Sequence, residues 1–276
     1  MKLQDTDWFK GFVRMADDGY NMGWHECNGG NLSYRIKKEE IDVINDSLTD
    51  TSDRNGWTDI GTLVPELGGE FFLITGSGKF FRNISLMPED TLGIIEVNES
   101  GSRYRTVWGF VNGARPTSEL ITHLMNHRVK KRISEGRYRV IYHAHPSDII
   151  ALSFVLPLED EVFTKELWGI MTECPIVFPR GIGVVPWLIP GSVELGKATA
   201  ELMEKYDAAV WAHHGMFVTG EDFDHTFGLM HTVEKSAGIL LKQMSTGRDK
   251  LSHITAEQFK MLADRFNLKL DERFLK

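Results

Sequence analysis

The segment with the clearest chemical potential is Tyr142-His143-Ala144-His145-Pro146, in which one residue separates two histidines. Residues 139–145 have the pattern of a strand, and successive strand side chains point to opposite faces. His143 and His145 therefore share one face, where two imidazoles can hold one metal ion. Because histidine pairs at this spacing also occur without a metal, the segment alone leaves both a metal site and two ordinary core or surface histidines open.

A third histidine ligand is available further along the chain. Trp211-Ala212-His213-His214-Gly215 places a predicted strand, 208–213, directly before a glycine turn. His213 and His214 face opposite ways, so at most one of them can serve, and we expect His214, which adjoins the glycine. Three protein ligands and an open fourth position are typical of catalytic zinc sites.

Pro116-Thr117-Ser118-Glu119-Leu120 has the character of a helix start. Proline suits the first helical turn and threonine suits a cap, so we expect a helix from Pro116–Thr117 to about Ile133. The helix dipole favours an acidic residue in a first turn, and this is sufficient to explain Glu119 without any catalytic role.

An alternative metal site lies along the same helix. Glu119, His123 and His127 are spaced i, i+4 and i+8, which puts them on one stripe. A row along a straight helix converges poorly on one ion and leaves His143 and His145 unexplained. We therefore rank this alternative below the strand site.

Two loops of small residues could bind an anion. Asn28-Gly29-Gly30-Asn31-Leu32 precedes a predicted strand and Thr75-Gly76-Ser77-Gly78-Lys79 follows one. Glycines let backbone N–H groups approach an anion, and Ser, Thr and Asn side chains add donors. The second loop does not have Walker A spacing. Each loop alone is also explained as a turn, but Thr117 and Ser118 would form a natural third wall for a phosphate.

Met171-Thr172-Glu173-Cys174-Pro175 carries a further carboxylate. Nothing near Glu173 distinguishes it from a solvated glutamate in a turn. The residues themselves therefore assign it no chemistry.

The elements that position these residues form an α/β pattern without a strict βαβ rhythm. We expect a layered domain with a central, mostly antiparallel or mixed sheet. The polar segment 45–69 is interpreted as an excursion within one domain, 1–276, because no linker divides the chain. The expected strands are 32–36, 71–75, 92–97, 103–110, 139–145, 176–178 and 208–213, and the other expected helices are 5–22, 147–155, 158–168, 192–206, 224–244 and 255–266.

Composition limits the class of protein. The 276 residues are 42 % hydrophobic and 25 % charged, which is typical of a folded chain. A net charge of −8 disfavours an electrostatic nucleic-acid binder, although a small anion needs only a local patch of donors.

Two cysteines, Cys27 and Cys174, make no disulfide framework and indicate a reducing cytoplasm. The N-terminus has no apolar signal region, and the longest apolar stretch, 149–158, is too short to span a membrane.

Together, these segments resemble the class II aldolase/adducin family, from the helix at Trp8 to the helix ending near Met244. No motif after about Ser245 contributes to the resemblance. The ordered segments that carry it are GW-x-E-x-NGGNL (23–32), TGSGKFFRN (75–83), PTSEL (116–120), HAH (143–145), TEC (172–174), VFP-x-G-x-G (177–183) and HG (214–215).

The resemblance implies an α/β/α arrangement around a largely antiparallel sheet and a cyclic homotetramer with active sites at subunit interfaces. It implies one Zn²⁺ per subunit on His143, His145 and His214, a catalytic Glu119, and a second catalytic glutamate, Glu173, from the neighbouring subunit. The implied phosphate and substrate site consists of Asn28, Asn31, Gly76, Ser77, Gly78, Thr117 and Ser118.

The implied activity is retro-aldol cleavage of a small phosphorylated sugar, L-rhamnulose 1-phosphate, to dihydroxyacetone phosphate and L-lactaldehyde. Cleavage of L-fuculose 1-phosphate and 4-epimerisation of a pentulose 5-phosphate are alternatives on the same scaffold. A non-catalytic scaffold protein, like the adducin branch of the family, ranks low because Glu119 and all three histidines are present.

Overall fold

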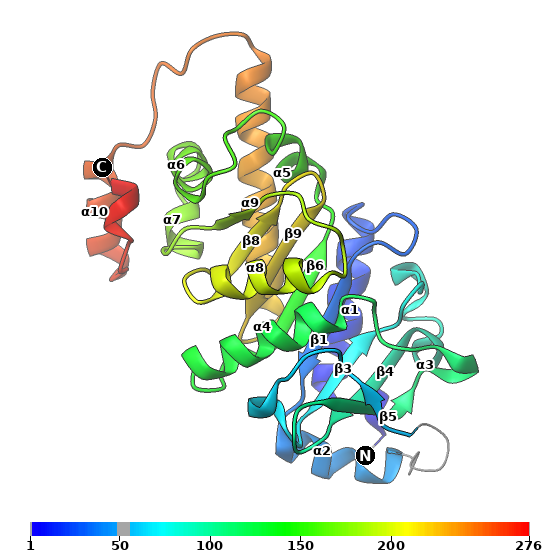
Figure 1. The fold of residues 1–276 in the computed structure, drawn as a ribbon. Coiled ribbons are helices and arrows are strands. Elements are labelled where there is room, and N and C mark those ends of the chain that lie inside the picture. Colours follow the sequence, from blue (N-terminus) through cyan, green and yellow to red (C-terminus); the bar gives the residue numbers. More distant parts are fainter. Residues whose placement is uncertain (1, 49–55, 276) are drawn as a thin grey trace.

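A nine-stranded sheet forms the centre of the protein in a computed structural model that describes residues 2–48 and 56–275 (Figure 1). The strand order is β2-β5-β4-β3-β1-β6-β9-β8-β7, and every neighbouring pair is antiparallel except β7 and β8. The strands are β1 (Asn31–Arg35), β2 (Thr58–Asp59), β3 (Phe71–Thr75), β4 (Leu92–Val97), β5 (Arg103–Gly109), β6 (Val140–Ala144), β7 (Gly183–Val185), β8 (Ala208–Trp211) and β9 (Gly215–Gly220).

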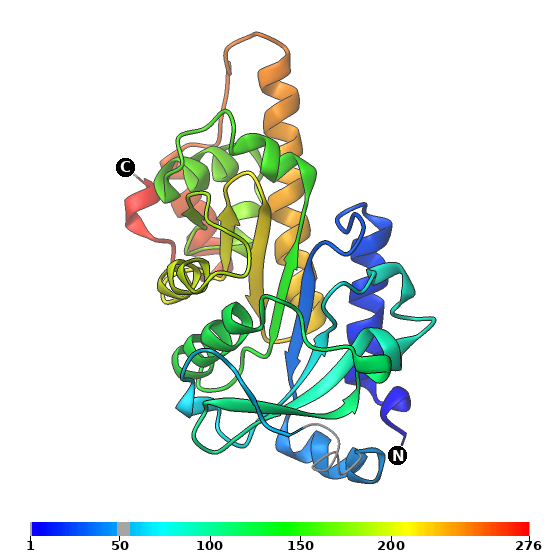
Figure 2. The ribbon, with the colours of Figure 1, turned by 45° about the vertical axis from the view of Figure 1, so that its right-hand side comes forward.

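Helices cover both faces of this sheet. The helices α4 and α8 pack on one face, whereas α1 and α9 cover the other, with α5 and α6 packed against α9 (Figure 2). This arrangement confirms the predicted α/β/α fold class. The helices are α1 (Asp7–Asn21), α2 (Lys38–Ile44), α3 (Pro88–Thr91), α4 (Leu120–Ile133), α5 (Ser147–Leu152), α6 (Asp160–Ile170), α7 (Cys174–Val177), α8 (Val193–Met203), α9 (Phe223–Ser245) and α10 (Ala256–Phe266).

Strand β6 shows how the alternation of side chains builds two cores. Val140, Tyr142 and Ala144 lie in the core beneath α1 and α9, while Ile141 lies in the core beneath α4 and α8. The latter face also carries His143, because strand side chains repeat every two residues. The apolar residues of β6 therefore anchor the strand on both sides and leave the histidines at its end.

One predicted strand is wrong, and the observed strands β7 and β9 were not predicted. Residues 176–178 do not form a strand, because helix α7 occupies Cys174–Val177 with Pro175 in its first turn, where proline is well tolerated. The strand lies instead at β7, a three-residue segment paired in parallel with β8. Strand β9, which was not predicted, pairs along its length with β6 and β8.

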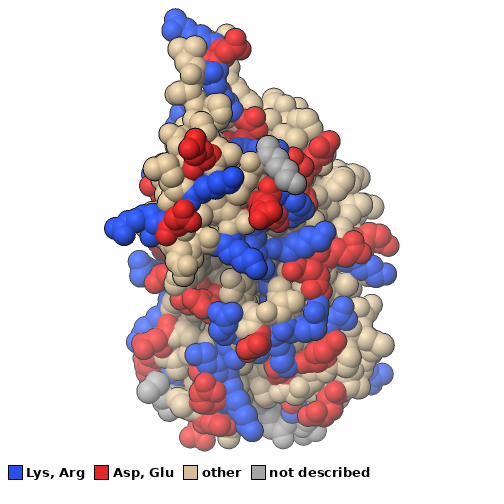
Figure 3. Space-filling model, turned by 90° about the vertical axis from the view of Figure 1, so that its left-hand side faces the viewer, with Lys and Arg blue, Asp and Glu red and all other residues tan. Residues whose placement is uncertain are grey.

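The excursion predicted at 45–69 is partly described. Residues 49–55 of it lie outside the described residues, and β2 within it pairs with β5 at the edge of the sheet. Among the described helices, none has the length and apolar character needed to cross a membrane. On the face shown in Figure 3, basic and acidic side chains are interspersed rather than gathered by sign.

Candidate metal and active site

Three histidines converge at the ends of the central strands. His143 is near the end of β6, His145 follows that strand, and His214 lies in the turn between β8 and β9. Because β6 and β9 are paired, the turn lies beside the end of β6. The Nε2 atoms of His143 and His145 are 3.2 Å apart, and candidate ligand atoms of all three histidines lie within 4.8 Å of one another.

The neighbouring histidine, His213, turns away from this cluster. Its backbone is left-handed (φ 61°), and its Nδ1 atom lies 3.1 Å from the Ser153 hydroxyl. Its ring packs on Phe154 with a centroid distance of 4.2 Å. The structure thus brings His214 to His143 and His145, as the sequence analysis expected.

Hydrogen bonds on the outer side of two rings fix the orientation of those rings. His143 Nδ1 donates to the Met216 carbonyl at 3.0 Å, and His145 Nδ1 donates to Glu26 Oε1 at 2.5 Å. The Nε2 lone pairs then face each other, an arrangement that is repulsive unless a cation lies between them. Burial lowers the pKa of His143 well below its usual value and that of His214 to about 4. The rings of His143 and His214 are therefore neutral, which is the form that binds metals, so the donor set fits a metal ion.

Glu26, the hydrogen-bond partner of His145, was not predicted to belong to the site, although it lies inside the GW-x-E-x-NGGNL segment. We expect Glu26→Ala to weaken the affinity for a divalent metal ion by roughly 10–100-fold, because a carboxylate on the outer nitrogen orients a ligand imidazole and raises its basicity. Competition with a chromophoric chelator measures this affinity. Glu221→Ala, which removes a carboxylate from the exposed His225 pair, is the matched control. If the two variants bind the metal with equal affinity, Glu26 does not support metal binding.

Glu119 lies beside the histidines and is buried, with 4 % of its surface exposed. Its Oε2 atom is 3.9 Å from His143 Nε2 and accepts a hydrogen bond from Asn31 Nδ2 at 2.9 Å. Burial raises the pKa of Glu119 to about 7, while the bond from Asn31 opposes the rise. A carboxyl group so placed can exchange a proton with a ligand in the adjoining pocket.

The helix after Glu119 begins later than predicted, at Leu120 rather than Pro116–Thr117. Two backbone hydrogen bonds hold the preceding residues extended: Thr117 N donates to Thr75 O at 3.0 Å, and Ser77 N donates to Arg115 O at 2.9 Å. These bonds also place the 75–79 loop directly against the 116–119 segment. Two of the three predicted anion-binding walls are therefore joined by their backbones.

The alternative helix site is not assembled. His123 and His127 both lie within hydrogen-bonding distance of Ser33 Oγ, at 2.6 and 2.8 Å, and His123 Nε2 bonds Asn31. Glu119 precedes the helix as its N-cap residue. The two rings therefore point at strand β1 and engage it instead of sharing one ion with Glu119.

A small pocket of about 160 Å³ unites the predicted residues. Its polar lining contains every residue predicted for metal or phosphate binding, together with Glu119. The residues are Asn28, Gly29, Gly30, Asn31, Gly76, Ser77, Gly78, Thr117, Ser118, Glu119, His143, His145 and His214.

His25, which was not singled out in the sequence, supports the first loop of this pocket. Its Nδ1 atom donates to Gly29 O at 2.9 Å, its Nε2 atom accepts from the Tyr142 hydroxyl at 2.6 Å, and its ring stacks on Phe81. Gly30 has φ 78°, and a Cβ there would come within 2.5 Å of His25. Only glycine fits this position comfortably.

Glu173 is the predicted catalytic residue that the pocket of this chain does not contain. It is exposed and immediately precedes helix α7. Its assignment to a neighbouring subunit stays a prediction.

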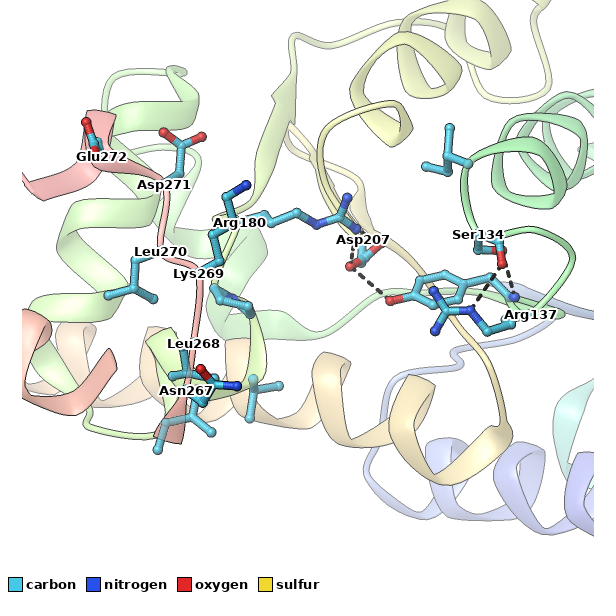
Figure 4. A pocket seen from close by; sticks show the side chains of 15 residues that line it. Ser134, Arg137, Arg180, Asp207, Asn267, Leu268, Lys269, Leu270, Asp271 and Glu272 are labelled. Carbon is cyan, nitrogen blue, oxygen red and sulfur yellow. Dashed lines mark hydrogen bonds and ion pairs between the residues drawn. The ribbon is translucent and has the colours of Figure 1, made fainter. Parts of the chain in front are cut away.

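A larger cleft, of about 1060 Å³, lies away from the histidines, between the C-terminal segment and the end of α4 (Figure 4). Its charges are balanced: Arg137, Arg180 and Lys269 line it together with Asp207, Asp271 and Glu272. Arg180 is engaged with both carboxylate oxygens of Asp207 at 2.6 Å. Volume alone therefore does not identify the reactive site.

The family profile described as "Class II Aldolase and Adducin N-terminal domain" matches residues 11–241. This match covers well over half of the chain. The chain belongs to the class II aldolase and adducin family. The three histidines, Glu119, the small-residue segments that line the pocket and the whole sheet lie within the matched residues of this class II aldolase family member.

Individual relatives extend the similarity over nearly the whole chain. A rhamnulose-1-phosphate aldolase of Mannheimia succiniciproducens is 44 % identical over 264 residues, which cover 95 % of this chain and 96 % of that protein. A rhamnulose-1-phosphate aldolase of Pectobacterium atrosepticum is 42 % identical, with 95 % of both chains covered. A crystal structure of a sugar-phosphate aldolase from Thermotoga maritima has a TM-score of 0.71 and 29 % identity, covering 86 % of this chain and 95 % of that chain.

Proposed function

We propose that this protein is a zinc-dependent aldolase that cleaves L-rhamnulose 1-phosphate to dihydroxyacetone phosphate and L-lactaldehyde in L-rhamnose catabolism. The observation that carries the proposal is the convergence of three histidines and a buried glutamate at one end of a pocket walled by small-residue loops. Identities of 42–44 % to rhamnulose-1-phosphate aldolases over nearly complete chains support the substrate.

One zinc ion per subunit would be held by His143, His145 and His214. Bound zinc supplies Lewis-acid stabilisation of the negative charge that develops on the ketose oxygens as the carbon–carbon bond breaks. Three histidines suit zinc, and the hydrogen bonds to Met216 O and Glu26 keep the Nε2 atoms of two of them available.

The protein's carboxylates would move two protons. Glu173 from a neighbouring subunit takes the proton of the C4 hydroxyl, and the electrons of the C3–C4 bond pass to the C3 side as that bond breaks. The C4 fragment leaves as the aldehyde. Glu119 then delivers a proton to C3, which completes dihydroxyacetone phosphate; in the synthetic direction it removes that proton.

The phosphate would lie against Asn28, Ser77, Thr117 and Ser118, with backbone N–H groups of the glycine loops. The direct backbone bonds between the 75–79 and 116–119 segments hold two of these walls together. Phosphate binding at a rigid site supplies remote binding energy that positions the reacting carbons next to Glu119.

A cyclic homotetramer would bring Glu173 to the pocket of the next subunit. Large apolar side chains exposed near the site are consistent with coverage by another subunit: Phe154 packs on His213, and Trp187 and Ile189 belong to a loop whose Gly191 lies next to Ser118. The two free thiols, Cys27 and Cys174, are consistent with a cytoplasmic location.

Cleavage of L-rhamnulose 1-phosphate, measured as dihydroxyacetone phosphate released, tests the proposal. We expect activity in the purified protein, loss of activity after chelation, and recovery when zinc is restored. L-Fuculose 1-phosphate and a pentulose 5-phosphate are assayed in parallel. Faster cleavage of the fuculose ester, or an epimerised product without free aldehyde, would replace the proposed substrate. Inactivity on all three would contradict the enzyme assignment.

A further inference from the structure

Strand β1 carries a row of polar side chains that is buried against helix α4. By alternation, Asn31 and Ser33 share the face of the strand that meets His123 and His127 of the helix. All four side chains are 5 % exposed or less. Burying polar groups in a core is unfavourable unless they are hydrogen-bonded, so a row of this kind needs an explanation beyond packing.

The four side chains form a continuous chain of hydrogen bonds that ends on Glu119. Burial lowers the pKa of His123 to about 3 and that of His127 well below its usual value, so both rings are neutral and each has one donor and one acceptor nitrogen. The contacts are Asn31 to Glu119 at 2.9 Å, His123 Nε2 to Asn31 Oδ1 at 2.5 Å, and Ser33 Oγ to His123 Nδ1 at 2.6 Å and to His127 Nε2 at 2.8 Å.

The contact with the carboxylate determines the direction of every bond in this chain. Asn31 donates through its amide N–H to Glu119 Oε2, so its Oδ1 atom accepts from His123 Nε2–H. His123 Nδ1 then accepts from the Ser33 hydroxyl, whose oxygen accepts from His127 Nε2–H. Each group donates toward Glu119, and hydrogen bonds aligned in this way reinforce one another.

We propose that His123, Ser33 and His127 are positioning residues that lock the Asn31 amide and, through it, hold the Glu119 carboxylate toward the metal pocket. The phosphate loop begins at Asn28, and a rotated Asn31 amide would turn its oxygen toward the carboxylate. The buried chain prevents this rotation without touching the substrate. The inference rests on the proposed function for its kinetic test only.

Ser33→Ala removes the central link and leaves both histidines without that partner. We expect kcat to fall by about 10- to 100-fold, since small displacements of a reacting group have effects of this size. KM and zinc content should stay near the wild-type values. His127→Phe, which removes the terminal donor but keeps a ring of similar shape, should lower kcat in the same direction. Ser33→Thr restores the hydroxyl and should recover most of the turnover.

Thr219→Val is the matched control, because it removes another buried hydroxyl from the sheet, one that donates to Val140 O at 2.9 Å. If both Ser33→Ala and Thr219→Val lose thermal stability but only Ser33→Ala loses kcat, positioning is supported. Equal kcat values in the two variants would overturn it.

A crystal structure of Ser33→Ala separates this inference from the proposed function. We expect the Asn31–Glu119 contact, 2.9 Å in the intact protein, to lengthen or to show alternative side-chain positions. An unchanged contact would overturn the positioning role whatever the substrate is. If the wild-type protein cleaves no sugar phosphate, the proposed function is contradicted. The crystal structure of Ser33→Ala still tests the positioning role in that case.

Discussion

His145→Ala is expected to lose bound zinc and aldolase activity together. The substitution removes one of three converging imidazoles, and two histidines with an open coordination sphere hold zinc poorly. Zinc is measured by mass spectrometry after dialysis, and activity as dihydroxyacetone phosphate released. We expect roughly one zinc ion per chain in the wild-type protein and almost none in the variant.

His213→Asn is the matched control for that experiment. It removes a neighbouring imidazole that contacts Ser153 and Phe154 rather than the cluster, and asparagine tolerates the left-handed backbone at this position. The control should retain zinc and activity. Stoichiometric zinc in His145→Ala would contradict the three-histidine site and reopen the question of where the metal binds.

Glu119→Gln is expected to retain zinc while turnover falls by roughly 10²–10⁴-fold, the usual contribution of a general acid–base group. Glutamine preserves the size of the side chain and can still accept the hydrogen bond from Asn31, but it cannot take up a proton from carbon. Steady-state kinetics and zinc analysis of the same preparation measure both quantities. Full activity would remove Glu119 from the mechanism; loss of zinc would show that it acts mainly as a ligand.

The same variant tests the proposed interface when it is co-expressed with Glu173→Gln. Each variant alone should be nearly inactive, because each lacks one carboxylate in every site. In a mixed cyclic assembly, about a quarter of the sites combine an intact Glu119 with an intact Glu173 from the neighbour, so activity should partly return. Mixtures no more active than their components would contradict a site shared between subunits.

Most elements of the fold could be predicted because their patterns are local. Strands β3 and β4 lie where short apolar runs predicted buried strands, and helices α1 and α10, which begin after the capping residues Thr6 and Thr255, lie close to the predicted ranges 5–22 and 255–266. The failures have physical reasons. The apolar segment predicted as a strand is helical, with Pro175 in the first turn, where proline is well tolerated, and β7 is too short to show a period in the sequence.

Which histidines form the candidate site could also be predicted from the sequence. Two histidines at alternate strand positions share a face in any register, so His143 and His145 had to lie together. The choice of His214 over His213 needed only the expectation that adjacent side chains diverge and that the glycine turn exposes one of them. Each of these inferences depends on backbone geometry over a few residues.

Contacts between distant segments were decided by the tertiary structure alone. The pairing of β6 with β9 brings His214 to the other two histidines, and the bond from Glu26 to His145 joins residues 119 positions apart. Asn31 and Ser33 look like the solvent side of a half-exposed strand, yet α4 covers them and links them to His123 and His127. A sequence pattern reports which side chains share a face, whereas the packing of another element determines whether that face meets water, a metal pocket or a buried chain of hydrogen bonds.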